Sequence, residues 1–474
     1  MTPEEFRRLG HRLVDWAADY RAGIAERPVG PQVEPGQVRA ALPAEPPPKG
    51  EPLDRAIDDL DRLVTPAMVQ WQHPRFFGWF PSNGLDAGVL ADFVSTSLGV
   101  IGLSWNSAPA LTEIEEVTCD WMRRMCGLSD AFTGVIQDTA STASLVALIT
   151  ARERATDYAA SREGLQGEAQ PLAVYVSTHS HSSVDKAAAL AGFGRAHVRQ
   201  VPTDAEHAMR PDALEAMIEE DLARGVKPCA VVATCGTTGV TAFDPLAAIG
   251  AVARKHGPWL HVDAAMAGSG LILPELRPLF DGIELADSII VNTHKWLGVP
   301  FDCTLYFVRD PQTLIRVMST NPSYLHSARD AEVKNYRDWG IPLGRRFRAL
   351  KLWFVIREQG VEGLQARLRR DLGNAQWLAA KVEAAQDWRL VAPVKLQTVC
   401  VRHEPDGLTG EALDAHTRDW AERLNASGEA WVTPAVLDGR WMVRASIGAI
   451  ATERTDVEAL WAAMRRMAET PPAG

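Results

Sequence analysis

The sequence predicts an α/β fold built on a mostly parallel sheet, and three observations support this prediction. From Leu172 to Val308 short apolar segments alternate with helical patterns, as in sheets whose parallel strands are joined by helices. Two of these segments, which begin at Trp259 and Ser288, are rich in β-branched residues and have the length of buried strands. A chain of 474 residues is also too long for one compact core, so two or three domains are expected.

The N-terminal region predicts two helices joined by an extended arm. Thr2-Pro3-Glu4-Glu5 offers a Thr N-cap, a Pro at the first helical position and a Glu at the capping-box position. Eight prolines between Pro28 and Pro52 favour an extended arm, and a second helix is expected from Leu53 to about Val64. Because two helices and an arm bury little surface by themselves, we expect residues 1–84 to pack on a partner chain.

The remaining elements are expected in chain order. Helical patterns dominate from Leu85 to Arg154, with a break at residues 99–107. Strands are then expected at 172–177, 197–201 and 230–234, at the two runs above, and at 304–308. A helical stretch follows at 344–370. The C-terminal part should contain strands at 396–402, 431–436 and 441–447 and helices at 410–425 and 455–467. We therefore expect an N-terminal helical segment at 1–84, a large domain at 85–358 and a small C-terminal α/β domain at 359–474.

Composition excludes several classes of partner. A formal net charge of −11 argues against nucleic acid and against an anionic membrane surface. No apolar run has the length of a membrane span, and the first residues are polar rather than signal-like. The six cysteines form neither a CxxC pair nor a Cys/His cluster at zinc spacing. We expect reduced thiols in a cytoplasmic protein that has no metal site.

An amine and a carboxylate follow the two apolar runs. Asp263 ends the first run, and Lys295 comes shortly after the second. Ligands of open α/β sheets bind outside the carboxyl ends of the strands, so both groups would face one crevice. The pair suits pyridoxal phosphate, which needs a Lys for a Schiff base and an acid beside its pyridine nitrogen. Each residue has a simpler alternative, because Lys295 could be solvated and Asp263 could cap a helix.

Two hydroxyl-rich segments are candidates for a phosphate site. Residues 139–144 open a helical run, and Thr237-Thr238 follow another expected strand. Either cluster could instead be a simple capping turn. His181 starts a helix after the strand at Leu172, where it could lie flat on a planar cofactor or be purely structural.

Residues 322–339 are polar and lack a clear period, which suits a mobile lid that closes over substrate. Tyr324 and Tyr336 are candidate proton donors in this segment, because a carbanion must be protonated after carbon dioxide leaves. At least one of the two tyrosines is expected to anchor the loop instead.

Four motifs together resemble the pyridoxal-phosphate-dependent group II decarboxylases, especially the bacterial aromatic-L-amino-acid decarboxylases. The motifs are Asn292-Thr293-His294-Lys295-Trp296, His261-Val262-Asp263-Ala264-Ala265, His181-Ser182-Ser183-Val184 and Gly236-Thr237-Thr238. The resemblance covers nearly the whole chain and implies a fold type I, aspartate-aminotransferase-like homodimer whose N-terminal segment wraps over the partner. It implies decarboxylation of an aromatic L-amino acid (L-DOPA, 5-hydroxytryptophan, tryptophan, tyrosine or phenylalanine) to its amine.

The resemblance also implies roles for individual residues. Lys295 would bind the cofactor covalently, Asp263 would contact the pyridine nitrogen, and His181 would stack on the ring near the substrate carboxylate. Tyr324 would protonate Cα. The cofactor would also contact Ala140, Ser141, Thr238, Ala265, Asn292 and His294, of which all but Ala265 would hold its phosphate end. The substrate pocket would be lined by Trp71, Phe80, Pro81, Ser82 and Gly344, with Ile101 and Leu103 reaching in from the partner chain.

Departures from the animal enzymes concern the substrate more than the cofactor. Met266 stands where those enzymes have Tyr, Leu103 where they have Phe, and Ser82 where they have Thr. Gly344 stands where the related histidine decarboxylases carry Ser, and it leaves room for a larger ring, which disfavours histidine as substrate.

Two other activities and one other class of protein compete with this interpretation. Within enzymes the alternatives are histidine decarboxylase and an aromatic aldehyde synthase, which combines decarboxylation with oxidative deamination. Tyr324 disfavours the synthase, because a Phe at that place is associated with aldehyde-forming relatives. A non-catalytic pyridoxal-phosphate-binding regulator would be a different class, but the acidic N-terminal segment lacks a basic recognition helix.

Overall fold

The computed structural model describes residues 1–81, 84–320 and 327–470, which fall into two compact units. The larger unit comprises residues 82–370 and 392–396, and the smaller comprises 1–81, 371–391 and 397–474. Most of the expected N-terminal segment and most of the expected C-terminal domain therefore share one unit. The division between the units falls inside the long helix α12 (Ala349–Glu383). No helix in the described ranges combines the length and apolarity needed to cross a membrane.

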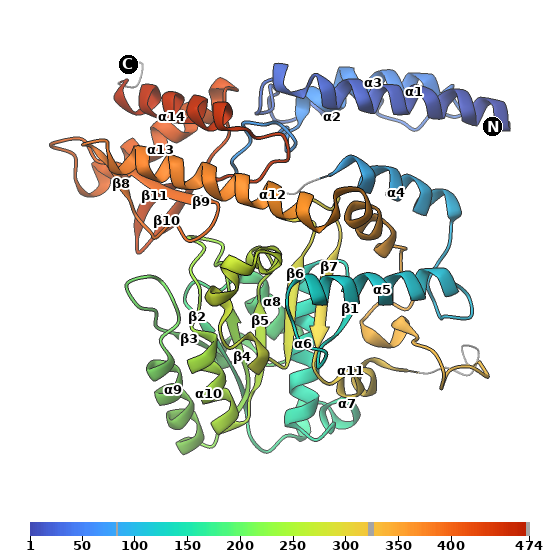
Figure 1. Ribbon diagram of the computed structural model, residues 1–474, viewed down its shortest axis with the longest axis vertical. Coiled ribbons are helices and arrows are strands. Elements are labelled where there is room, and N and C mark those ends of the chain that lie inside the picture. Colours follow the sequence, from blue (N-terminus) through green and yellow to red (C-terminus); the bar gives the residue numbers. More distant parts are fainter. Residues whose placement is uncertain (82–83, 321–326, 471–474) are drawn as a thin grey trace. The chain divides into compact units, whose positions relative to one another are not determined.

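The larger unit is built on a seven-stranded sheet with the order β1-β7-β6-β5-β4-β2-β3 (Figure 1). The strands are β1 (Thr133–Gln137), β2 (Leu172–Ser177), β3 (Val198–Val201), β4 (Lys227–Thr234), β5 (Trp259–Asp263), β6 (Ser288–Asn292) and β7 (Thr304–Val308). Strands β2 to β6 pair in parallel, and β7 is antiparallel to both of its neighbours, β6 and β1. Strand β1 therefore runs in the same direction as β2 to β6. The predicted α/β fold with a mostly parallel sheet is confirmed.

Helices cover the sheet and bury its strands on both faces. They are α4 (Asp86–Leu98), α5 (Pro109–Met125), α6 (Ala140–Ala155), α7 (Ala160–Glu163), α8 (Ser182–Leu190), α9 (Pro211–Ala223), α10 (Leu246–His256) and α11 (Pro311–Met318). Helix α6 packs on α8 and on the central strands, so that Val146 and Leu148 share one core with Val174 and Val232. Every residue of β2, β5, β6 and β7 is buried, which explains why most of their residues are apolar.

Strand β1 was not expected, because the sequence predicted only helices up to Arg154. This part of the prediction is wrong. Thr133–Gln137 contains only two adjacent large apolar residues, Val135 and Ile136, between two strong helical patterns. Its extended form results from antiparallel pairing with β7, a contact between residues far apart in the sequence.

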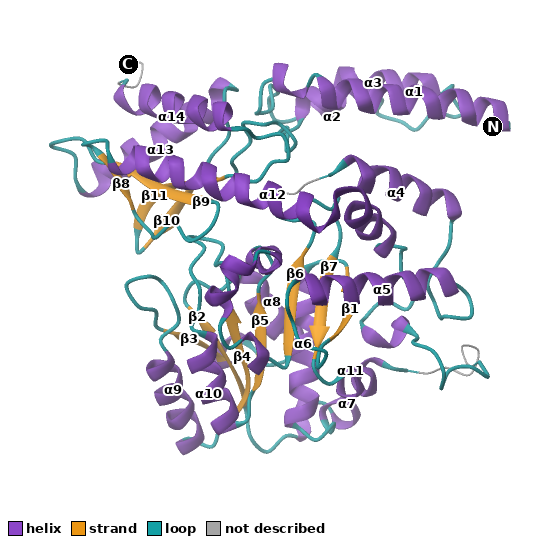
Figure 2. Ribbon diagram, viewed as in Figure 1, coloured by secondary structure: helices purple, strands orange, loops and turns teal. Residues whose placement is uncertain are grey.

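The smaller unit combines N-terminal helices with a four-stranded antiparallel sheet of order β10-β11-β9-β8 (Figure 2). Its elements are α1 (Pro3–Ala22), α2 (Gln37–Ala41), α3 (Leu53–Asp59), β8 (Trp388–Leu390), β9 (Thr398–His403), α13 (Gly410–Ser427), β10 (Thr433–Leu437), β11 (Arg440–Ser446) and α14 (Arg454–Glu469). The predicted capping box of α1 is present, with Thr2 and Glu5 exchanging hydrogen bonds. Arg8 and Arg12 pair with Asp54 and so tie α1 to α3.

Candidate active site

Five predicted site segments follow strands that run in one direction. Asp263 is the last residue of β5, and Lys295 follows the neighbouring strand β6. Residues 139–141 follow β1, Thr238 follows β4, and His181 follows β2. Because the carboxyl ends of codirectional strands lie along one edge of a sheet, the five segments gather at that edge. The topology thus brings together groups that are spread over more than 150 residues of sequence.

His181 lies within electrostatic range of both Asp263 and Lys295. Desolvation lowers the pKa of His181, Asp263 opposes that shift, and Lys295 adds to it. The backbone N–H of Ser183 donates to His181 Nδ1 at 3.2 Å, and Ser183 Oγ lies 2.8 Å from the same nitrogen. Nδ1 therefore acts as an acceptor, and the neutral ring carries its proton on Nε2. As the N-cap of α8, His181 remains accessible although protein atoms desolvate part of its ring.

Asp263 is buried, and its carboxylate is held by a short turn. Its Oδ1 accepts a hydrogen bond from the backbone N–H of Ala265 at 3.0 Å. The helix that follows is a 3-10 helix that begins at Ala267, so Asp263 does not cap an α-helix. A buried carboxylate is costly without a cationic partner, and a protonated pyridine nitrogen would be such a partner.

The N-terminus of α6 (Ala140–Ala155) is a candidate for the first part of a phosphate site. Thr139 caps the helix by accepting a hydrogen bond from the N–H of Thr142, and Ser141 is exposed in the first turn. Free N–H groups and the positive end of the helix dipole favour an anion there. Thr304 Oγ1 lies 2.9 Å from Asn292 Oδ1 and 3.1 Å from the carbonyl of Asp138. Thr304, which the sequence analysis missed, therefore orients Asn292 beside this helix start.

His294 and Thr238 differ in how accessible they are. His294 is buried, and the N–H of Cys303 donates to its Nδ1 at 2.9 Å. Burial and then the charge of Lys295 lower the pKa of His294 to about 4, so the ring is neutral at pH 7. Thr237 is buried and its hydroxyl accepts the N–H of Ala242 at 3.0 Å, whereas Thr238 is exposed at the tip of the turn.

The set of side chains fits pyridoxal phosphate. Backbone N–H groups and hydroxyls at the start of α6 and at Thr238 suit a phosphate group. The carboxylate of Asp263 suits a pyridinium, and the amine of Lys295 suits the cofactor aldehyde. The small side chains of Ala140 and Ala265 leave space for a planar ring beside these groups.

Three predicted pocket residues meet in the larger unit, and we call Ile101, Leu103 and Gly344 the pocket wall. A Cβ placed on Gly344 would lie 3.2 Å from Ile101 Cγ2 and 3.8 Å from Leu103 Cδ2. The N–H of Gly102 donates to the carbonyl of Arg345 at 2.9 Å, which joins the two segments. These contacts all lie within one chain.

Predicted pocket residues of the smaller unit lie in an aromatic cluster. Trp71 stacks on Trp79, with ring centroids 5.1 Å apart and an interplanar angle of 13°. Phe80 is buried beneath the guanidinium of Arg444, which lies 5.0 Å from its ring centroid, and Pro81 is buried next to it. Trp79 was not among the predicted pocket residues, although the aromatic run at 76–80 could have indicated it.

Of the other predicted residues, Ser82 and Tyr324 lie outside the described residues. Tyr336, the second candidate donor, is buried, and its hydroxyl lies 3.5 Å from the carbonyl of Gly134. Burial raises the pKa of Tyr336 well above its ordinary value. Tyr336 is therefore an anchor for its loop.

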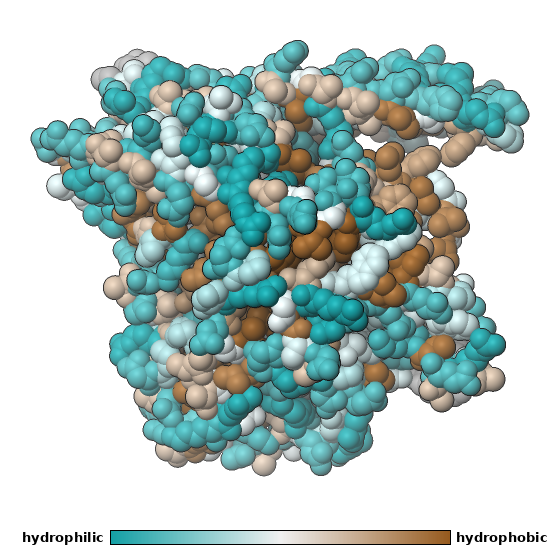
Figure 3. Space-filling model, in the orientation of Figure 1, coloured by the Kyte–Doolittle hydropathy of each residue, from teal (hydrophilic) through white to brown (hydrophobic). Residues whose placement is uncertain are grey.

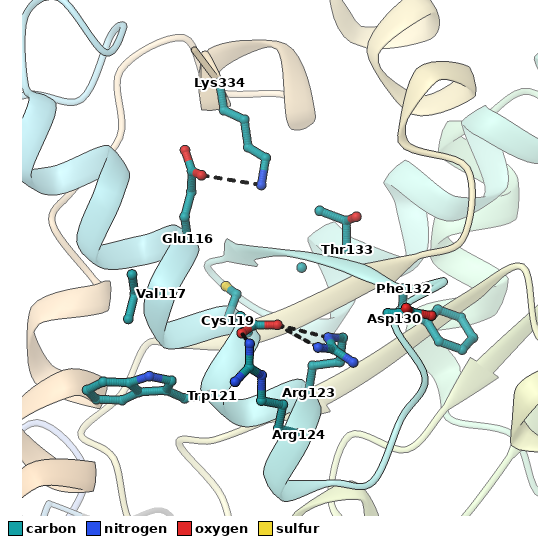
Figure 4. A pocket seen from close by; sticks show the side chains of 12 residues that line it. Glu116, Val117, Cys119, Trp121, Arg123, Arg124, Asp130, Phe132, Thr133 and Lys334 are labelled. Atoms are coloured by element: carbon teal, nitrogen blue, oxygen red, sulfur yellow. Dashed lines mark hydrogen bonds and ion pairs between the residues drawn. The ribbon is translucent and has the colours of Figure 1, made fainter. Parts of the chain in front are cut away.

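A separate cavity of about 540 Å³ lies beside α5 and β1 and contains none of the predicted site residues (Figure 4). Lys334 pairs with Glu116 across its mouth at 3.5 Å, and Asp120 pairs with Arg123 and Arg124 at 2.7 Å each. The charged groups in these pairs neutralise one another, so we assign no ligand to the cavity.

Comparison with known proteins places this geometry in a family. The pyridoxal-dependent decarboxylase conserved domain matches residues 35–404. The aromatic-L-amino-acid decarboxylase of Bos taurus is 39% identical over 483 residues, which cover 99% of this chain and 97% of that protein. The phenylacetaldehyde synthase of Arabidopsis thaliana is 39% identical over 471 residues, covering 97% and 95%. The structure of Oryza sativa TDC with PLP and tryptamine superposes with a TM-score of 0.96 at 36% identity, covering 99% of this chain and 98% of that one. The chain therefore belongs to the pyridoxal-dependent decarboxylase family, which confirms the family, the fold type and the cofactor that the sequence predicted.

Proposed function

We propose that this enzyme decarboxylates aromatic L-amino acids to the corresponding amines. The observation that carries the proposal is the convergence of Lys295, Asp263 and His181 at one edge of the sheet. The aromatic substrate class is supported by the relatives, which are named for aromatic amino acids or their products. L-DOPA, 5-hydroxytryptophan, tryptophan, tyrosine and phenylalanine are the candidate substrates.

Bound pyridoxal phosphate supplies an electron sink for the bond that breaks at Cα. The amine of Lys295 would hold the cofactor covalently, and Asp263 would keep the pyridine nitrogen protonated. His181 would cover the ring and direct its Nε2–H toward the substrate carboxylate. Ala140, Ser141, Thr238, Asn292 and His294 would hold the phosphate end, and Ala265 would pack against the ring.

A proton must reach Cα after carbon dioxide leaves, and we assign its delivery to Tyr324. The assignment rests on the family motif Asn321-Pro322-Ser323-Tyr324-Leu325. Burial of Tyr336 supports it, because that hydroxyl already serves as an anchor. The segment 322–339 would act as the lid that excludes water from the site.

The active form is proposed to be a homodimer. On α4 the side chains of Leu90, Phe93 and Leu98 are more than half exposed. Figure 3 shows apolar side chains gathered on the surface where α4 lies. An exposed apolar surface of this kind marks a contact with another protein chain. Ile101, which is also exposed and belongs to the pocket wall, continues this surface beyond the end of α4. A second copy of the chain would cover α4 and receive Ile101 and Leu103 next to its own substrate, as the resemblance implies. Because Gly344 contacts both residues within one chain, it would reach the partner's pocket together with them.

The dimer can be tested with Leu90→Glu. A buried interface carboxylate should yield monomers in sedimentation-velocity runs and reduce activity. The exposed Leu190→Glu change on α8 is the control, since Leu190 is no less exposed but lies on another face. A Leu90→Glu enzyme that stayed dimeric would remove α4 from the interface.

A cytoplasmic location and the absence of a nucleic-acid partner are also proposed. All six cysteines are buried as free thiols, which suits a reducing compartment. The net charge of −11 would repel a nucleic-acid backbone.

The decisive experiment is a product assay across the five aromatic amino acids and histidine. Amine and carbon dioxide should form in equal amounts, with little hydrogen peroxide and least turnover of histidine. Stoichiometric peroxide with aldehyde and no amine would replace the proposal by the aldehyde-synthase activity, to which the Arabidopsis thaliana relative gives weight. Borohydride should attach the cofactor to the peptide that contains Lys295, and Lys295→Ala should prevent that attachment.

A further inference from the structure

A buried ion pair closes one open edge of the large sheet. Strand β1 is one of the two edge strands, and the backbone N–H and carbonyl of Ile136 point away from β7. The N–H of Ile136 donates to Glu115 Oε1 at 2.8 Å, and its carbonyl accepts from Arg345 Nη2 at 2.6 Å. Arg345 also forms two hydrogen bonds to the Glu115 carboxylate, at 2.6 and 3.0 Å. The pair thus takes the place of a further strand.

Arg345 also joins this edge to the pocket wall. It follows Gly344 directly, and its carbonyl accepts the N–H of Gly102 between Ile101 and Leu103. At the other end of its side chain, Ile136 lies three residues before Thr139, which caps the phosphate-binding helix α6. Arg345 therefore connects the pocket wall with β1, the strand that leads to the proposed phosphate site at the start of α6.

We infer that Arg345, held by Glu115, is a positioning residue that sets the pocket wall for the substrate ring. It acts through Gly344 and Ile101 and makes no contact with substrate itself. The planar guanidinium bridges a carboxylate and a carbonyl at once, which a Lys ammonium on a flexible chain cannot reproduce. The inference rests on the proposed role of the pocket wall in substrate binding.

The next residue of α5 provides a matched control. Glu116 pairs with Lys334, so it ties α5 to the same segment that leads to Arg345 (Figure 4). The Glu116–Lys334 pair is partly exposed, and its atoms are 3.5 Å apart. Exposed ion pairs contribute little free energy, so the Glu116–Lys334 pair should not fix the position of the pocket wall.

The experiment compares Arg345→Lys with Lys334→Gln in the holoenzyme, using tryptophan and phenylalanine as substrates. Arg345→Lys should raise KM about tenfold for tryptophan and shift the tryptophan-to-phenylalanine ratio of kcat/KM, because a loosened wall misplaces the ring. Cofactor content should stay near that of the unmodified enzyme, whereas the thermal midpoint should fall somewhat, because the buried Glu115 carboxylate loses part of its hydrogen bonding. Lys334→Gln should leave all four quantities unchanged.

Unchanged KM values in Arg345→Lys would overturn the inference. An equal loss of kcat for both substrates, together with lost cofactor, would also overturn it by showing a merely structural role. If Arg345→Lys does not fold, Glu115→Gln is judged by the same criteria, because it keeps an oxygen for the Ile136 N–H. If neither variant folds, the Arg345–Glu115 pair serves only the stability of the fold, and the inference that Arg345 positions the pocket wall is refuted.

Gly344→Ala separates this inference from the proposed function. A changed substrate ratio in Gly344→Ala with unchanged KM in Arg345→Lys refutes positioning alone. An unchanged ratio in Gly344→Ala shows instead that the pocket wall was wrongly assigned.

Discussion

Adding one methyl group at Gly344 should narrow the substrate pocket without harming the fold. The new Cβ would lie 3.2 Å from Ile101 Cγ2, which is closer than an ordinary van der Waals contact. The contact is with a side-chain methyl group, which need shift by only a few tenths of an ångström, and Gly344 has no left-handed backbone conformation that a side chain would strain. The methyl group should therefore occupy space that a large ring would otherwise use.

The expected magnitude follows from the size of one carbon atom. A methylene group in a pocket changes discrimination by about 1–3 kcal/mol, or about 10–200-fold. For Gly344→Ala we expect the tryptophan-to-phenylalanine ratio of kcat/KM to fall at least about tenfold, which corresponds to about 1.4 kcal/mol. Most of the change should appear in the value for tryptophan, because its ring is larger.

The assay is amine production by both substrates at several concentrations, with the thermal midpoint measured alongside. Gly363→Ala is the control, since its added Cβ would meet only Gln359, at 3.7 Å, across the kink at Gly360 in α12. Equal losses for both substrates, or an unchanged ratio, would refute the placement of Gly344 in the pocket. A large drop in midpoint would show that the methyl group strains the fold instead.

Three further predictions concern the dimer, the lid and acid stability. A heterodimer of one Lys295→Ala chain and one Gly344→Glu chain should keep about half of the activity. If each pocket wall serves the partner's site, the site that contains the intact Lys295 receives the unmodified wall. An inactive heterodimer would show that the wall belongs to the site of its own chain. Tyr324→Phe should retain bound cofactor but lose about a hundredfold or more of amine production, with peroxide appearing instead; an unchanged amine yield would move the proton donor elsewhere. Burial lowers the pKa of His261 to about 4, against about 6.5 in an unfolded chain. The unfolded state therefore binds a proton that the folded state rejects, and about 3 kcal/mol of stability present above pH 6.5 should be lost as the pH falls toward 4. Urea unfolding at a series of pH values gives the free energy of unfolding as a function of pH. In that pH window its slope should be shallower for His261→Asn than for the unmodified enzyme, and an unaltered slope would show that another group titrates.

The cofactor site was predictable because its chemistry lies in short contiguous motifs at strand ends. Asp263 ends a buried strand and Lys295 follows the neighbouring one, so the rule for open α/β sheets was enough to aim both at one edge. The sequence could not show that β1 is a strand, because its extended form depends on pairing with β7. The local pattern left the role of His181 open, and only the resemblance implied that it stacks on the cofactor ring. The structure adds the hydrogen bond from the Ser183 N–H and the nearby charges of Asp263 and Lys295.

The sequence by itself determined the family, the fold type and the cofactor, and it predicted the residues that would bind that cofactor. Only the tertiary structure showed that Gly344, Ile101 and Leu103 form one wall, and that Arg345 ties this wall to the edge of the sheet. Glu115 and Arg345 are 230 positions apart, so neither the periodicity nor the composition around either residue carries a trace of the pair. Local patterns record which strand or helix a residue belongs to, whereas such contacts exist only once the sheet has formed and its edge needs hydrogen-bond partners.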